Sequence, residues 1–157
     1  MNTPSFPINL EPCDFCTFSE DQAAISFTQQ TFSFISLQKC IRDVMGDIKS
    51  RTLVPPNVVI DVEEKMLVST NKQTLLSIYY CLLEAIITSN KNYQVHISAK
   101  LIGNITLTHI RCSHAEYNDE IAASLKRTEP MAESLGGCIT VSNDIHGLTL
   151  AFTFINH

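Results

Sequence analysis

The stretch NKQTLLSIYYCLLEAIITSN (71–90) decides the fold of this chain, because it predicts one long buried helix. Either Thr70 or Asn71 can cap the start of this helix. Apolar side chains then cover more than one face of it, which is typical of a helix packed against a sheet. These apolar positions are Leu75, Leu76, Ile78, Tyr79, Leu82, Leu83, Ile86 and Ile87.

Helical and strand periodicities alternate on both sides of this stretch. We predict strands at 31–37, 57–62, 65–69, 93–102, 105–112, 138–142 and 148–155, and helices at 36–50, 71–89 and about 119–135. The dipeptide Gly103-Asn104 and the loop NDIHG (143–147) predict tight turns between the last two strand pairs. Because strands adjacent in sequence favour antiparallel pairing, we expect an α+β fold. This would be a two-layer α/β sandwich with a mixed, mostly antiparallel sheet and its helices on one face.

Proline and glycine define where several elements stop. Pro55 and Pro56 end the helix at 36–50, because proline lacks an amide donor and restricts the residue before it. Pro130 is expected to interrupt or restart the helix near 119–135, and Gly136-Gly137 to terminate it.

The first 30 residues differ from the rest of the chain. They contain three prolines and little periodicity, so we interpret 1–30 as an N-terminal arm or linker with a short helix at 21–30, and 31–157 as the domain. Cys13 and Cys16 form a C-x-x-C pair there, but the chain has no second C-x-x-C to complete a four-ligand zinc site. We expect two free thiols, with a metal bridging two copies of the chain as the alternative.

Composition and charge exclude several classes of protein. The net charge is −5 and the 11 Lys and Arg residues form no cluster, so we expect no nucleic-acid partner. No stretch approaches the roughly 18–20 apolar residues that span a bilayer, and the N-terminus lacks a secretory signal. We therefore expect a cytoplasmic protein whose six cysteines are reduced.

The histidines offer little sign of catalysis. His96 and His109 alternate out of phase with the apolar residues of their strands, so we predict that both lie on the surface. His114 follows Cys112, but a reactive dyad would need an exposed thiol with a lowered pKa, and no third residue completes a triad. We do not expect nucleophilic catalysis here.

Two segments resemble a known family. The long helix at 71–90 and the closing segment MAESLGGCITVSNDIHGLTLAFTFI (131–155) are similar to parts of the ATP-binding domain of sensor histidine kinases. That domain belongs to the GHKL superfamily with DNA gyrase B and MutL, and has the Bergerat fold. The resemblance covers about residues 31–155 and implies a kinase-like ATPase domain in two-component signalling.

The residues that serve the nucleotide in that family are replaced. The family's magnesium-binding Asn corresponds to Ala85, and its activating Asn or Glu corresponds to Cys81. Neither side chain is a good ligand for a hard metal ion. Glu84 is adjacent, but one residue along a helix turns a side chain by about 100°. The glycines of the family's phosphate-binding motif fall at Ala122 and Ser124, where a side chain hinders close approach to phosphate.

The adenine-binding motif is also missing. IRCSHAEYNDE (110–120) contains no Asp followed by the family's glycines, and the connector that replaces the nucleotide lid is short. The resemblance with these losses implies a catalytically inactive domain without a cofactor, acting as a protein-interaction module. Its partner surface would be the groove beside helix 71–89 or the N-terminal arm. The partner would be a signalling protein such as a response regulator or a kinase, or a second copy of the chain in a homodimer.

Two alternatives remain. A diverged kinase or ATPase could bind Mg-ATP through a rearranged site that recruits Glu84, Asn118, Asp119 or Glu120. The chain could instead be a structural fragment of a longer kinase.

Overall fold

The computed structural model describes residues 32–89 and 94–157. Its elements, in chain order, are β1 (Ser33–Ser36), α2 (Leu37–Arg51), β2 (Asn57–Asp61), β3 (Leu67–Thr70), α3 (Lys72–Ser89), β4 (Gln94–Ile102), β5 (Ile105–Ser113), α4 (Asp119–Ser134), β6 (Cys138–Asp144) and β7 (Gly147–Ile155). The predicted helix at 21–30, the Cys13–Cys16 pair and the predicted boundary between residues 30 and 31 lie outside the described residues.

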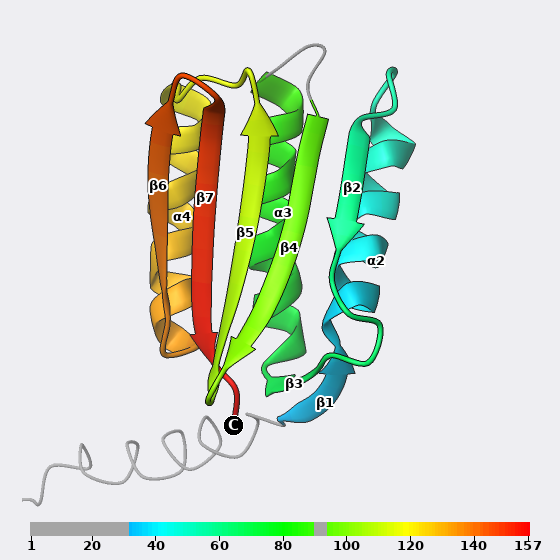
Figure 1. Ribbon diagram of the computed structural model, residues 1–157, viewed down its shortest axis with the longest axis vertical. Helices are drawn as coiled ribbons and strands as arrows, with labels where there is room; N and C mark the ends of the chain where they lie inside the picture. The colour runs from blue at the N-terminus through cyan, green and yellow to red at the C-terminus, as the bar shows by residue number, and fades with distance from the viewer. Residues whose placement is uncertain (1–31, 90–93) are drawn as a thin grey trace, which may run out of the picture. The chain divides into compact units, whose positions relative to one another are not determined.

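The main sheet has five strands in the order β2-β4-β5-β7-β6. β2 pairs with β4 in parallel, and the other three pairings are antiparallel. The three helices of the described residues lie behind one face of this sheet (Figure 1). The predicted α+β fold, with a mixed and mostly antiparallel sheet and its helices on one face, is confirmed. None of the helices in the described part of the chain is long and apolar enough to cross a membrane.

The expectation that neighbouring strands pair was wrong for β2 and β3. β3 instead pairs antiparallel with β1 in a separate two-stranded sheet. The connection between β2 and β3 is held by the start of α2, where Leu37 N–H donates to the Met66 carbonyl and the Gln38 amide donates to the Val62 carbonyl. The connection itself turns at Glu63, whose carbonyl accepts from the Met66 N–H at 3.0 Å, and the chain then continues into β3 beside β1.

Helix α3 is the centre of the core, as its sequence predicts. Asn71 rather than Thr70 caps it, because the Asn71 side chain accepts from the Thr74 N–H at 3.0 Å. The Tyr79 hydroxyl lies 2.7 Å from the Thr108 hydroxyl on β5, which satisfies both groups in the interior. Eight residues of α3 are buried: Leu75, Ile78, Tyr79, Leu82, Leu83, Ala85, Ile86 and Ile87.

Helix α4 corrects one prediction and confirms another. Pro130 neither interrupts nor restarts the helix, which continues through it to Ser134. Pro130 is on the exposed side of the helix, which continues although the proline cannot donate to the residue-126 carbonyl and crowds it. The helix ends at the predicted glycines, where Gly136 has φ +69° and the Gly137 N–H donates to the Ala132 carbonyl.

Candidate functional site

The four positions that the family resemblance assigns to the nucleotide pocket lie on two helices that pack against each other. Cys81 and Ala85 are on α3, and Ala122 and Ser124 are on α4. Ser124 is 1% exposed, and its hydroxyl donates a 2.8 Å hydrogen bond to the Cys81 carbonyl oxygen. Ala85 is also buried. The structure therefore brings Cys81 and Ser124 together by direct contact of the two helices.

The N-terminus of α4 is occupied by side chains of the chain itself. The Asn118 side chain caps the helix by accepting from the Ile121 N–H at 3.0 Å. Asp119 and Glu120 occupy the first turn, and the Glu120 carboxylate lies 3.0 Å from the Ser89 hydroxyl on α3. A helix N-terminus ordinarily attracts anions. Here an amide group and two carboxylates of the chain already occupy that position.

Glu84 belongs to a polar network that links α3 to α2. Its carboxylate accepts a 3.2 Å hydrogen bond from the Tyr80 hydroxyl. Arg51, the last residue of α2, donates to the same hydroxyl at 3.1 Å and lies over the Tyr80 ring. Desolvation and the neighbouring Glu84 carboxylate raise the pKa of Tyr80, so its hydroxyl remains a donor. Glu84 therefore has a structural partner on its own helix.

A hollow of about 340 Å³ lies between α2 and α3. Val44 and Leu76 provide apolar surface within it, and Asp43 and Asp47 provide two carboxylates on the α2 side. Cys81 is half-buried and lines the same hollow. This hollow lies on the α2 side of helix 71–89, whereas the emptied nucleotide groove that the resemblance implies lies toward α4, where Ser124 packs against Cys81.

Cys112 does not have the environment of a nucleophile. It is 1% exposed, and burial raises the pKa of its thiol to about 11. His114 is exposed with φ 61°, in the turn that follows β5. A thiol that stays protonated at neutral pH is a weak nucleophile. Over the described residues, no group of three or more His, Cys, Asp or Glu side chains is placed to hold a metal ion.

Comparison with known proteins relates this fold to one class of domain. No family model matches the sequence, and no curated protein matches it. Among solved structures, the catalytic domain of histidine kinase ThkA superposes with a TM-score of 0.69 at 15% identity, covering 80% of this chain and 96% of that domain. The Acinetobacter baumannii histidine kinase AdeS superposes with a TM-score of 0.72 at 11% identity, covering 87% and 73%.

A third structure contains a second protein. ThkA in complex with the response regulator protein TrrA superposes with a TM-score of 0.60 at 14% identity, covering 87% of this chain and 46% of that one. The fold of this chain is therefore similar to that of the catalytic domain of histidine kinases, as its sequence predicted.

Proposed function

We propose that this chain is a histidine-kinase-like ATPase domain that has lost nucleotide chemistry and acts in signal transduction by binding another protein. The observation that carries the proposal is the buried hydrogen bond from Ser124 to the Cys81 carbonyl. It joins the two helix positions between which the resemblance would place a nucleotide. A nucleotide there would have to separate α3 from α4 and break that bond.

The residues present do not suit Mg-ATP. Ala85 offers no metal ligand, and magnesium in proteins requires oxygen ligands in addition to phosphate and water. Ala122 and Ser124 place side chains where phosphate would need close backbone amides. Asp119 and Glu120 would repel the phosphates of a nucleotide bound at the start of α4. We derive no catalytic step through ATP for this chain.

The alternative of an active enzyme with a rearranged site has less support. Of the residues that it would recruit, Glu84 bonds Tyr80, Asn118 caps α4, and Glu120 contacts Ser89. Among the described residues, only the Asp119 carboxylate of this set makes no side-chain hydrogen bond or ion pair. One carboxylate without a phosphate-binding loop is a poor site for a magnesium nucleotide.

The partner that we propose is a response regulator, and the surface is the hollow between α2 and α3. The related fold of ThkA is seen in complex with a response regulator. The hollow combines apolar surface from Val44 and Leu76 with the carboxylates of Asp43 and Asp47, so it suits a partner segment with an apolar residue flanked by basic ones. A histidine kinase and a second copy of this chain are the other partners to test. The cytoplasm is the compartment that such a role requires.

Calorimetric titration with Mg-ATP tests the loss of nucleotide binding. We expect no heat of binding at millimolar nucleotide and no thermal shift, whereas a ligand at 100 times its Kd would stabilise the domain by about 2.7 kcal/mol. Micromolar affinity would contradict the proposal and favour the enzyme alternative.

Affinity capture from the native cell tests the partner. We expect the wild-type chain to recover a response regulator and Asp47→Lys to lose it, because the change reverses a charge in the hollow. Glu63→Lys is the matched control, since Glu63 is an exposed acidic residue in the connection between β2 and β3. If all three proteins recovered the response regulator equally, the hollow would not be the docking surface.

A further inference from the structure

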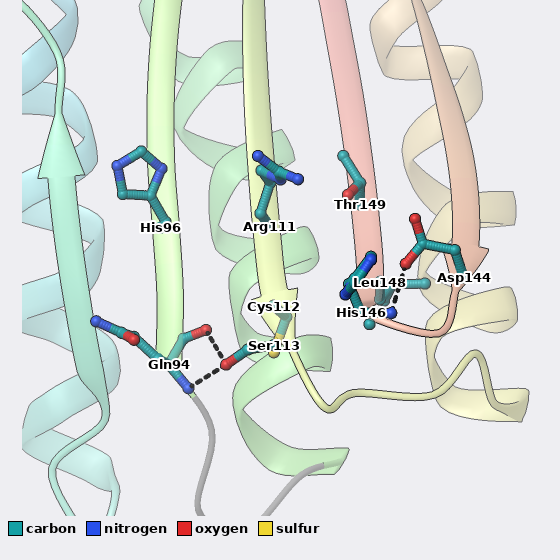
Figure 2. A pocket seen from close by; sticks show the side chains of 10 residues that line it. Gln94, His96, Arg111, Cys112, Ser113, Asp144, His146, Leu148 and Thr149 are labelled. Carbon is teal, nitrogen blue, oxygen red and sulfur yellow. Dashed lines mark hydrogen bonds between the residues drawn. The ribbon is translucent and has the colours of Figure 1, made fainter.

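The face of the sheet opposite the helices has a pocket of its own, with a volume of about 230 Å³. Figure 2 shows it at one end of the sheet, where β4, β5 and the turn between β6 and β7 meet. Its polar lining includes Gln94, His96, Arg111, Ser113, His146 and Thr149, with Asp144 at the turn. No part of it belongs to α3 or α4, so it is independent of the closed nucleotide position.

Strand register explains how these side chains gather. His96 on β4 lies opposite Arg111 on β5, and Arg111 lies opposite Thr149 on β7. In the next row Ser113 lies opposite Gly147, and its hydroxyl is hydrogen-bonded to the main chain of Gln94 at the start of β4. Because residues two apart on a strand share a face, both rows are on the face away from the helices.

A glycine keeps the β7 end of the second row open. Gly147 has φ +127°, and a Cβ added there would lie 2.2 Å from the Cys112 carbonyl oxygen. No side chain can therefore occupy this position without moving the backbone of β5. Beside it, the Asp144 side chain accepts a 2.8 Å hydrogen bond from the His146 N–H, which fixes the turn that carries the His146 ring (Figure 2).

Arg111 is an exposed cation at this pocket. Among the described residues its guanidinium forms no ion pair and no hydrogen bond. Of the two neighbouring carboxylates, Asp144 is bonded to the turn and Asp61 lies 3.9 Å from His96 Nε2. His96 and His146 border the pocket on its two sides and supply ring nitrogens that can donate hydrogen bonds. The pocket therefore presents donors from three directions around a permanent positive charge.

We propose that this pocket binds the phosphate group of a small phosphorylated ligand. A guanidinium fork matches phosphate geometry, and charge-assisted hydrogen bonds to it are stronger than neutral ones. Donors on β4, on β5 and on the β6–β7 turn suit a tetrahedral group with several oxygens better than a planar carboxylate. The volume is below the roughly 300–1,000 Å³ of pockets for drug-sized ligands, so the ligand is small.

The test is an amide NMR titration of the full chain with inorganic phosphate, with acetate in parallel. We expect saturable shifts at Ser113, Gly147 and Thr149 with phosphate and weaker ones with acetate. Arg111→Gln should weaken phosphate binding about tenfold or more, since it removes the charged donor. The matched control is Lys100→Gln. Lys100 is an exposed cation on the same face of β4, and it does not line the pocket.

Several results would overturn the proposal. If phosphate shifts no pocket amide, or if Lys100→Gln weakens binding as much as Arg111→Gln, the site is only diffuse surface charge. If acetate binds as well as phosphate, the assignment to phosphate is wrong. Unchanged amide shifts for β6 and α4 in Arg111→Gln would show that the variant is folded, so a loss of binding would report on the pocket.

Discussion

The Ser124 hydroxyl on α4 donates a 2.8 Å hydrogen bond to the main-chain carbonyl oxygen of Cys81 on α3. Both residues occupy positions that serve the nucleotide in the family that the sequence resembles. Buried hydroxyls of this kind are satisfied by a partner or are costly to bury. The replacement at Ser124 therefore has a structural role of its own, which is to hold the two helices together.

Ser124→Ala should lower the free energy of unfolding by about 0.5–1.5 kcal/mol, the net value of one intramolecular hydrogen bond. Urea denaturation of the purified domain measures this change. Ser134→Ala is the control, because the exposed Ser134 hydroxyl bonds only the Met131 carbonyl of its own helix. An equal effect of the two substitutions would show that the contact with Cys81 does not stabilise the packing of α3 on α4.

Ala85→Asn should leave the chain unable to bind Mg-ATP, although it restores the family's metal ligand. Magnesium is held mostly by phosphate oxygens and water, so one protein ligand has little effect when nothing binds the phosphates. Burying the amide costs about 1–3 kcal/mol, and we expect a destabilised but folded domain. A fluorescent nucleotide should give no saturable signal. Saturable binding would show an otherwise intact pocket and would restore the enzyme alternative.

Periodicity and turn chemistry predicted most of the fold. Seven of the eight apolar positions predicted for α3 are buried, and the eighth, Leu76, is partly buried. The β4–β5 and β6–β7 hairpins and the end of α4 at Gly136 were also correct, because each depends on residues close in sequence. The pairing of β3 with β1 was not predicted, since it depends on bonds between the start of α2 and the connection before β3. The predicted interruption of α4 at Pro130 was wrong, because an exposed proline can be tolerated within a helix held by packing.

The candidate sites were harder to predict from the sequence than the fold. The altered positions Cys81, Ala85, Ala122 and Ser124 were identified by resemblance, but the contact that joins α3 to α4 depends on how helices far apart in sequence pack. Arg111 and His146 were not identified as site residues. Their gathering depends on strand register, and alternation alone indicated only that His96 faces the surface.

Leu83→Ala should cost about 2–5 kcal/mol of stability, the range for truncating a buried leucine. Leu83 is a residue of α3 that is 0% exposed and belongs to the hydrophobic core. Leu76→Ala is a comparison on the same helix, because Leu76 is only partly buried and lines the hollow next to α2. We expect it to cost clearly less in the same chemical denaturation assay. A change below about 1 kcal/mol for Leu83→Ala would contradict the packing of α3.

Stability should fall at alkaline pH. Burial raises the pKa of Cys112 to about 11 and also raises the pKa of Tyr79, whose hydroxyl remains bonded to Thr108. In the unfolded chain these groups ionise near pH 8.5 and 10, so the unfolded state loses protons first. The free energy of unfolding is therefore highest below about pH 8.5, where both groups are neutral in both states, and it declines as pH rises toward 11.

Urea midpoints at pH 7.5, 9 and 10 test this dependence. The Cys112→Ala variant should show a smaller decline over the same pH range, because it lacks one of the groups whose pKa is raised by folding. Identical declines for the variant and the wild-type chain would mean that ionisation of Cys112 is not coupled to unfolding.

Two glycine substitutions should change stability in opposite directions. Gly46 lies within α2, and a Cβ added there meets nothing within 4 Å. Gly46→Ala should stabilise the domain by about 0.5–1 kcal/mol, because alanine loses less backbone entropy in a helix, and should raise Tm by roughly 2–4 °C.

Gly137 follows α4, and a Cβ there would lie 1.7 Å from the Thr153 carbonyl oxygen on β7. Gly137→Ala must displace backbone, so it should cost more than about 3 kcal/mol or prevent folding. Thermal denaturation of both variants measures the contrast. If Gly137→Ala melted within a few degrees of the wild-type chain, the close approach of the α4–β6 turn to β7 would be wrong.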